Sequence, residues 1–317
     1  MGRILNNHSA IHTFPEIHFF EQLWSRADNG KILSEEKATL LASRLLNISR
    51  EGYFAKLHLS DFLVEAKSIL KNEPLTAIQV YKKILEHETF RAGKKIIAKQ
   101  TPQNVFYISE IMENIPDAKF IFMVRDARSV LLSQKNKWRR KFLGGTHAGW
   151  HETIRAWFNY HPYTISKLWN ASFNAGAKWK SNQNVLQIKF EDLVSNPETI
   201  VKSIGTFIGV DFQTEMLNIP KLGSSLGKDL AGEKGIRTDR AESWKNGALT
   251  SAEISICEKV CGENLKALGY ELSNKKINPL AQIYYFILFP LKTCGAFLLN
   301  LHRMKNIRET LRKRFGK

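Results

Sequence analysis

The segment KFIFMVRDARSVLLS, Lys119 to Ser133, decides the fold. Its first part, Lys119 to Val124, is a short and almost uniformly apolar run that follows the turn-forming pair Pro116-Asp117. Length and β-branched and aromatic content favour a buried parallel strand. The pattern then changes to helical spacing, with Asp126 as the expected N-cap. Arg125 is therefore expected where a strand ends and a helix begins, the edge at which open α/β sheets bind ligands.

Arg125 and Ser133 together indicate an anion site. If a helix begins at Asp126, Ser133 lies roughly 10 Å along it, a gap that an extended arginine side chain spans in large part. A guanidinium and a hydroxyl two turns later suit a tetrahedral anion. The alternative is an arginine in a surface ion pair and a serine that faces solvent, and this pair of residues alone does not separate the two interpretations.

Further segments surround this one in a definite order. They are Lys99 to Pro102, Pro116 to Lys119, Phe190 to Val210, Ser243 to Thr250, and Leu268-Gly269-Tyr270. In order and spacing they resemble the bacterial-type sulfotransferases that use 3'-phosphoadenosine 5'-phosphosulfate (PAPS), over about residues 1 to 272. The resemblance implies transfer of a sulfuryl group from PAPS to a hydroxyl or amine acceptor, which could be a sugar, a lipid, a tyrosine or a small molecule.

The expected fold class is α/β, with a P-loop-type parallel sheet flanked by helices. We expect parallel strands near residues 94–99, 119–124 and 184–190. Residues 1–272 would form the sulfotransferase-like domain, in which a helical insert, residues 31–93, shapes the acceptor site. A long helix is expected from Gly149 to Gly176 with a kink at Pro162. Its expected core residues are Trp150, Ile154, Trp157, Phe158 and Ile165.

The start of the sequence lacks two features of the family. Arg3 to Asn7 reads as the end of a helix, whereas in these sulfotransferases a strand and a phosphate loop of the type Arg-Ser-Gly-Thr-Thr precede it. No G-x-x-x-x-G-K-[ST] pattern occurs elsewhere. Either Met1 is an internal methionine and the sequence starts too late, or the protein has lost the loop. Loss of an interior strand would leave unpaired sheet edges, so we favour the late start.

Three residues are candidates for catalysis. The resemblance places an acidic residue beside the acceptor hydroxyl, where Glu16 would act as general base, with His18 as the second candidate. Lys99 ends a predicted strand, and the lysine at the matching place in the family stabilises charge on the transferring sulfuryl group and the bridging oxygen. The alternatives are that Glu16 caps a helix, that His18 packs against that helix, and that Lys99 is solvated.

The resemblance also implies a site for the 3'-phosphate of PAPS. Arg125 and Ser133 would bind this phosphate. In the family, a basic, glycine-containing loop before a Trp-Lys pair covers this phosphate. The matching segment here is residues 223–247, which contain Trp244-Lys245. Arg-Thr-Asp replaces the Arg-Lys-Gly of the family, so Arg237 and Arg240 are both candidates.

Composition limits the partners. The formal net charge is +17 and the pI is near 9.7, which indicates an anionic partner such as a phosphorylated cofactor or an anionic membrane. Nucleic acid is not expected, because there is no zinc-finger spacing and no arginine-rich tract before the C-terminus. Three cysteines, two of them four residues apart at Cys257 and Cys261, indicate no disulfide framework and no metal site. We expect a metal-free cytoplasmic protein.

Residues 273–317 form an extension outside the resemblance. Residues 280–301 are strongly apolar, with Pro290 and Lys292 near the middle, and a tail rich in lysine and arginine follows. A helix at the surface of an anionic bilayer fits this pattern better than a spanning one. The sequence therefore predicts peripheral membrane association through residues 280–317. The alternative is a helix docked on the domain with a solvated basic end.

Two other functions compete with the enzyme. The first is a non-catalytic protein of the same fold that has lost its cofactor loop and acts as a membrane-associated interaction protein. The second is a P-loop kinase or NTPase, which we discount because the sequence has neither a Walker lysine motif nor a clear metal-binding aspartate.

Overall fold

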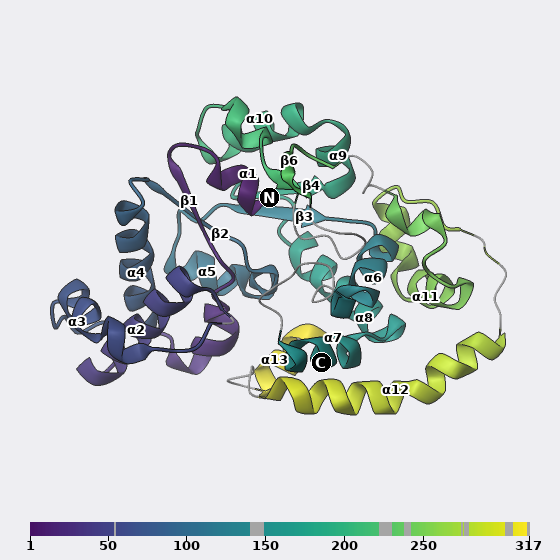
Figure 1. The fold of residues 1–317 in the computed structure, drawn as a ribbon, viewed down its shortest axis with the longest axis horizontal. Helices are drawn as coiled ribbons and strands as arrows, with labels where there is room; N and C mark the ends of the chain where they lie inside the picture. Colours follow the sequence, from purple (N-terminus) through teal and green to yellow (C-terminus); the bar gives the residue numbers. More distant parts are fainter. Residues whose placement is uncertain are drawn as a thin grey trace. The chain divides into compact units, whose positions relative to one another are not determined.

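The computed structural model is an α/β structure in which helices predominate (Figure 1). It describes residues 1–53, 55–139, 149–221, 230–237, 242–273, 275, 279–301 and 307–315. The chain divides into two units, and each is considered by itself. The first unit contains Met1–Ala118 and Phe212–Ile219, and the second contains Lys119–Asp211 and most of the chain from Pro220 onward.

The first unit is built on a pair of parallel strands, β1 (Ile11–Phe14) and β2 (Ile96–Lys99), in which Phe14 is paired with Lys99. The prediction of a strand near residues 94–99 is confirmed, whereas β1 was not expected. The other elements of this unit, apart from three long helices, are α1 (Gly2–Asn6), α5 (Ile108–Asn114), a π-helical turn (Phe19–Leu23) and 3₁₀ turns at Arg26–Asp28, Pro102–Tyr107 and Thr214–Leu217.

The chain between β1 and β2 forms three helices, α2 (Glu35–Glu51), α3 (Leu59–Leu70) and α4 (Ala77–Arg91). Ser34 caps α2 by accepting a hydrogen bond from the Lys37 amide, and Thr76 and Gln79 cap α4 reciprocally. The apolar faces of α2 and α4 are buried, as their sequence periodicity requires. The predicted helical insert is therefore present.

The second unit contains the parallel strands β3 (Phe120–Val124) and β4 (Val185–Lys189), which pair along their whole length. Both were predicted. β3 leads through Arg125 and Asp126 into α6 (Ala127–Lys135), and Asp126 accepts a hydrogen bond from the Arg128 amide as its N-cap. The two parallel pairs, β1–β2 and β3–β4, are separate sheets among the described residues.

The prediction of a single long helix from Gly149 to Gly176 is wrong. The structure has two helices there, α7 (Trp150–Asn159) and α8 (Pro162–Ala177). Pro162 occupies the first turn of α8, where its missing N–H costs nothing, so it begins a helix instead of kinking one. The expected burial of α7 is also wrong. Trp150, Ile154 and Trp157 are 63%, 49% and 44% exposed.

The core of the second unit lies between α6, α8 and α11 (Ser251–Ala267). Leu131 and Leu132 of α6 are buried there against Trp244, Cys257 and Cys261. The two cysteines therefore pack as small apolar side chains. The other short elements of the unit are α9 (Phe190–Ser195), α10 (Pro197–Ile208), the antiparallel strands β5 (Pro220–Lys221) and β6 (Leu230–Lys234), and a 3₁₀ turn at Ser243–Asn246.

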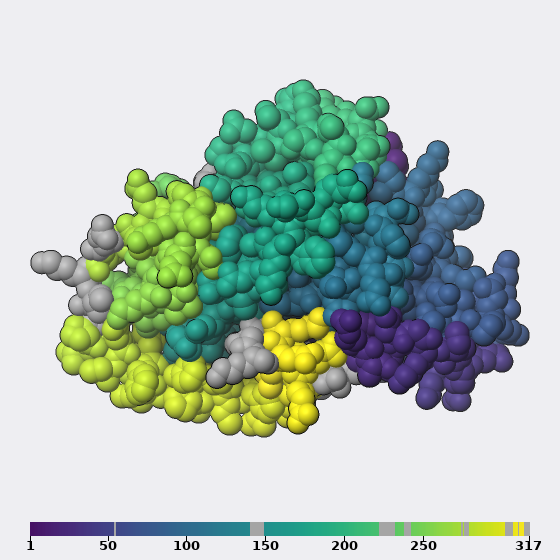
Figure 2. Space-filling view, turned by 180° about the vertical axis from the view of Figure 1, so that it is seen from behind, coloured from purple at the N-terminus to yellow at the C-terminus, as the bar shows by residue number. Residues whose placement is uncertain are grey.

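The C-terminal extension is helical. α12 (Pro279–Asn300) continues through Pro290, and α13 (Ile307–Phe315) follows. By length and composition α12 is the one helix among the described residues that could cross a membrane. It nevertheless packs along α7 and α11, and α13 packs on α8. In Figure 2 α12 lies at the molecular surface as a yellow-green band.

Candidate active site

The register of β1 and β2 brings the three predicted catalytic residues to one edge of one sheet. Lys99 is the last residue of β2 and pairs with Phe14, the last residue of β1. Glu16 and His18 follow two and four residues after Phe14. Since the strands are parallel, all three residues lie at the carboxyl edge, which is where α/β sheets bind ligands.

Lys99 is the most unusual cation of the first unit. Its Nζ atom is buried and has no hydrogen-bond partner among the described residues. It lies 4.6 Å from the centre of the Tyr81 ring, which packs in turn on Phe19. Burial without a counter-ion lowers the pKa of Lys99 to about 7. A bound anion would stabilise this buried amine, because the Tyr81 ring alone compensates little of the hydration that the amine has lost.

His18 lies between two carboxylates. Its Nε2 is 3.3 Å from Glu16 and its Nδ1 is 3.2 Å from the buried Glu21. Burial alone would lower the pKa of His18, but the hydrogen bonds and charges of the two carboxylates outweigh it and raise that pKa above its usual value. His18 also adopts a left-handed backbone conformation, with φ of 55°, and packs on Tyr53. The arrangement holds the His18 ring beside the half-exposed Glu16.

Arg125 is held at the carboxyl end of β3 by side chains from three other elements. Its guanidinium stacks on the Phe190 ring at 4.2 Å, and its Nη2 donates to the Ser243 hydroxyl at 3.4 Å. Its carbonyl oxygen accepts a hydrogen bond from the indole of Trp169. The site therefore presents a planar cation that is oriented before any ligand arrives.

Next to it is a buried charge network centred on Arg128. Asp126 accepts hydrogen bonds from Arg128 Nε at 3.0 Å and Nη2 at 2.7 Å, and Glu258 accepts one from Nη1 at 2.7 Å. The guanidinium also stacks on Trp244 at 3.8 Å. The network attaches the segment before α11 to the start of α6. Sequence reasoning did not identify Arg128, although its position two residues after the capping Asp126 was a usable signal.

Two further phosphate-site candidates, Ser133 and Arg237, belong to the same unit. Ser133 lies two turns along α6 and is half-buried. Arg237 is half-buried and follows β6, six residues before Ser243. Ser243 contacts Arg125 and Trp244 contacts Arg128. Arg240 lies outside the described residues.

Glu191 has a structural role at the end of β4. Glu191 accepts hydrogen bonds from the Asp126 amide at 3.1 Å and from the Tyr270 hydroxyl at 2.7 Å. It therefore connects the end of β4 to the start of α6. Tyr270 is the tyrosine of the Leu268-Gly269-Tyr270 motif, so the contact links two of the segments on which the sequence resemblance rests.

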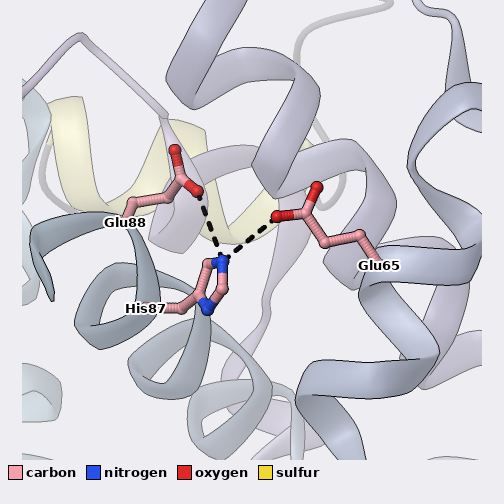
Figure 3. A group of neighbouring side chains, drawn as sticks. All are labelled: Glu65, His87 and Glu88. Carbon is pink, nitrogen blue, oxygen red and sulfur yellow. Dashed lines mark hydrogen bonds and ion pairs between the residues drawn. The ribbon is translucent and has the colours of Figure 1, made fainter. Parts of the chain in front are cut away.

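A second group of ionisable residues, Glu65, His87 and Glu88, has ligand atoms close enough to hold a metal ion (Figure 3). His87 Nε2 is 3.1 Å from Glu65 and 3.8 Å from Glu88. The same two carboxylate oxygens each lie 2.6 Å from Arg50 Nη2. A metal ion would have to displace this guanidinium. We therefore assign the group as an ion-pair network that joins α2, α3 and α4.

Comparison with known protein families gives one match. The sequence model of the sulfotransferase family matches residues 1–214. Among solved structures, the sulfotransferase domain from the curacin biosynthetic pathway covers 85% of this chain and 92% of its own, with 21% identity and a TM-score of 0.49. The sulfotransferase domain from the Synechococcus PCC 7002 olefin synthase covers 85% of this chain and 89% of its own, with 21% identity and a TM-score of 0.48. No curated protein sequence matches the chain.

Proposed function

Because the chain belongs to the sulfotransferase family, we propose that it transfers a sulfuryl group from PAPS to a hydroxyl or amine acceptor. The observation that carries the proposal is Lys99, a buried amine with no hydrogen-bond partner among the described residues, at the carboxyl edge of β1 and β2. An anionic phosphosulfate supplies the partner that this amine lacks. When bound, PAPS supplies the sulfuryl group and a bisphosphate leaving group.

Lys99 acts on the charge that develops during transfer. As the bond between sulfur and the bridging oxygen breaks, negative charge grows on that oxygen, and a lysine ammonium stabilises it most where water is excluded. The pKa of about 7 belongs to the protein without an anion. A bound phosphosulfate raises this pKa, so the lysine is protonated when the charge appears.

Glu16 accepts the acceptor's proton. The raised pKa of His18 favours its protonated form, which cannot take up a second proton, and this supports Glu16 over His18 as the base. His18, which Glu21 holds on its other side, instead orients the Glu16 carboxylate. In this proposal Glu16 is the general base and His18 is a positioning residue.

Arg125 and Ser133 bind the 3'-phosphate in this proposal, assisted by Arg237 and Arg240. The stacking of Arg125 on Phe190 supports this role, because it fixes the plane of the guanidinium and lowers the entropy lost when a phosphate binds. Like phosphoryl transfer, the reaction then depends on positioning and charge stabilisation.

Thermal unfolding with adenosine 3',5'-bisphosphate tests the proposal, with AMP as the control ligand. A ligand that binds only the native state raises the melting temperature, so we expect a shift with the bisphosphate alone. The shift should shrink in Lys99→Gln and Arg125→Gln and persist in Lys95→Gln, which removes an exposed lysine beside β2. A cooperative melt with no shift would contradict the enzyme assignment and favour a non-catalytic protein of the same fold.

A further inference from the structure

The outer face of α12 is a continuous apolar surface. Its exposed residues recur at helical spacing, so they share one side of the helix. They are Leu280, Ile283, Tyr284, Phe286, Ile287, Leu291, Phe297 and Leu298. Ile287, near the middle, is 69% exposed. Soluble proteins rarely leave a helix face of this size uncovered unless it binds something.

The opposite face of α12 is fixed to its own unit. Lys292, the only charged residue of the helix, is buried, and its amine donates a hydrogen bond to the Trp157 carbonyl at 2.8 Å. Asn300 at the end of the helix exchanges hydrogen bonds with Asn159 and Arg155, and the Tyr285 carbonyl lies 2.8 Å from His161 Nε2. The helix is therefore held near its beginning, its middle and its end.

Two other helices of the same unit also have exposed apolar side chains. Trp150, Ile154 and Trp157 form an exposed apolar stripe on α7, and the Trp157 ring contacts Lys292 of α12. On α13, Ile307 and Leu311 are exposed at a spacing of one turn. The same helix carries four lysine or arginine residues and one glutamate. The unit thus has exposed apolar residues on α7, α12 and α13, two of them tryptophans, together with a cationic helix.

We propose that this surface docks on an anionic lipid bilayer, with α12 lying in the plane of the interface. Apolar side chains enter the boundary of the hydrocarbon, and the cations of α13 pair with anionic headgroups. Charge complementarity favours a bilayer over a second copy of the chain, because two proteins of net charge +17 repel each other while an anionic leaflet attracts each of them.

The contacts of α12 decide between lying on a membrane and spanning it. A spanning helix would have to leave α7 and carry Lys292 into the hydrocarbon, losing the hydrogen bonds of Lys292 and Asn300. A helix that lies at the interface keeps all of these contacts and buries only its outer face. The proposal does not depend on the catalytic assignment.

Vesicle flotation of the whole chain tests the docking surface. We expect binding to vesicles of phosphatidylcholine with phosphatidylglycerol, and much weaker binding to phosphatidylcholine alone. Ile283→Glu with Ile287→Glu should weaken partitioning about tenfold or more, since two carboxylates replace apolar groups at the interface. Val64→Glu on α3, where the side chain is 82% exposed, is the matched control and should bind like the parent.

Two further measurements complete the test. Arg308→Gln with Arg312→Gln should weaken binding to the anionic vesicles and leave the melting temperature unchanged. Release of the bound protein by a carbonate wash at high pH supports a helix at the interface. Resistance to that wash, equal binding of the parent and the Ile283/Ile287 variant, or a dimer in sedimentation that this variant dissociates would each overturn the proposal.

Discussion

At the scale of single residues, Lys99 destabilises the folded protein and has a role in the proposed reaction. Its ammonium loses hydration on folding and has only the Tyr81 ring in exchange, which is why its pKa falls from 10.5 to about 7. Natural proteins seldom keep a buried unpaired cation unless a ligand completes it. The burial of Lys99 thus destabilises the fold at neutral pH, while the proposed reaction depends on this residue.

Replacing Lys99 by methionine should therefore stabilise the protein while abolishing transfer. Between pH 7 and 10.5 the unfolded chain holds a proton on this lysine that the folded chain has lost, so the stability of the parent rises with pH in this window. Lys99→Met has no titrating group at this position, so its stability lacks this dependence on pH. In urea unfolding, the free energy of unfolding of the variant should exceed that of the parent by most at or below pH 7, and the difference should shrink toward pH 10. A constant difference across that range would contradict the buried, unpaired amine.

Glu16 and His18 can be separated by their effects on turnover. Glu16→Gln should lower kcat by roughly 10²- to 10⁴-fold, the usual contribution of a general base, whereas His18→Gln should cost far less. Release of adenosine 3',5'-bisphosphate with a panel of sugar, lipid and phenol acceptors measures both. Comparable bisphosphate affinity in the two variants is the control for folding. The reverse order of effects would make His18 the base.

Arg128 is expected to matter for stability rather than for chemistry. Arg128→Met leaves the buried carboxylate of Asp126 without its partner, and breaking one side of a buried ion pair typically costs about 3–5 kcal/mol. Lys202→Met removes an exposed pair with Glu198 and should change the free energy of unfolding by less than about 1 kcal/mol. Chemical denaturation of both variants checks the contrast, and similar losses would be inconsistent with it.

At the scale of elements, the sequence predicted those structures whose signals are local. β2, β3 and β4 are short apolar runs, and α2, α4 and α6 have capping residues that the structure uses. β1 was missed because its four residues include His12 and Thr13, and its partner strand lies more than eighty residues later. Pairing over such a distance leaves no trace in a short window of sequence.

Periodicity predicted that α7 has an apolar face but not what covers that face. Trp150, Ile154 and Trp157 share one side of the helix, as a core face would, yet all three are exposed.

The candidate active site was also predictable only in part. Motif order located Arg125 and Lys99, but the aromatic rings beneath them, Phe190 and Tyr81, come from distant segments. A one-dimensional pattern cannot identify such partners.

The network of Arg50, Glu65, His87 and Glu88 should make the three-helix insert sensitive to acid. Hydrogen bonds and charge from Arg50 lower the pKa of Glu65. Burial would raise the pKa of Glu88, but Arg50 and Arg91 outweigh it and lower that value also. Stability from both carboxylates is present above about pH 4.5 and lost as pH falls through their lowered pKa values.

Variants of this network test both its acid sensitivity and its assignment. In urea unfolding between pH 6 and pH 3, Arg50→Met should flatten the pH dependence and lower stability at pH 6. Added Zn²⁺ should not raise the melting temperature of the parent, because Arg50 occupies the carboxylate oxygens. Stabilisation of the parent by Zn²⁺ would show that the group binds metal instead.

At the scale of the whole molecule, the charge of +17 should govern how anions reach the protein. Binding of adenosine 3',5'-bisphosphate should weaken by about tenfold as NaCl rises from 50 mM to 500 mM, because salt screens the attraction between a highly charged protein and a multivalent anion. Titration calorimetry at several salt concentrations measures this. Affinity that does not change with salt would mean that stacking and neutral hydrogen bonds dominate the binding.

The distribution of the three cysteines gives this protein a native attachment point for a spectroscopic label. Cys257 and Cys261 are buried in the core around α11, whereas Cys294 is exposed on α12. A thiol-reactive dye of the environment-sensitive kind should therefore couple at one position without any substitution. Since Cys294 lies on the same side of the helix as Ile287 and Leu291, its emission would report directly on whether that side faces water or lipid.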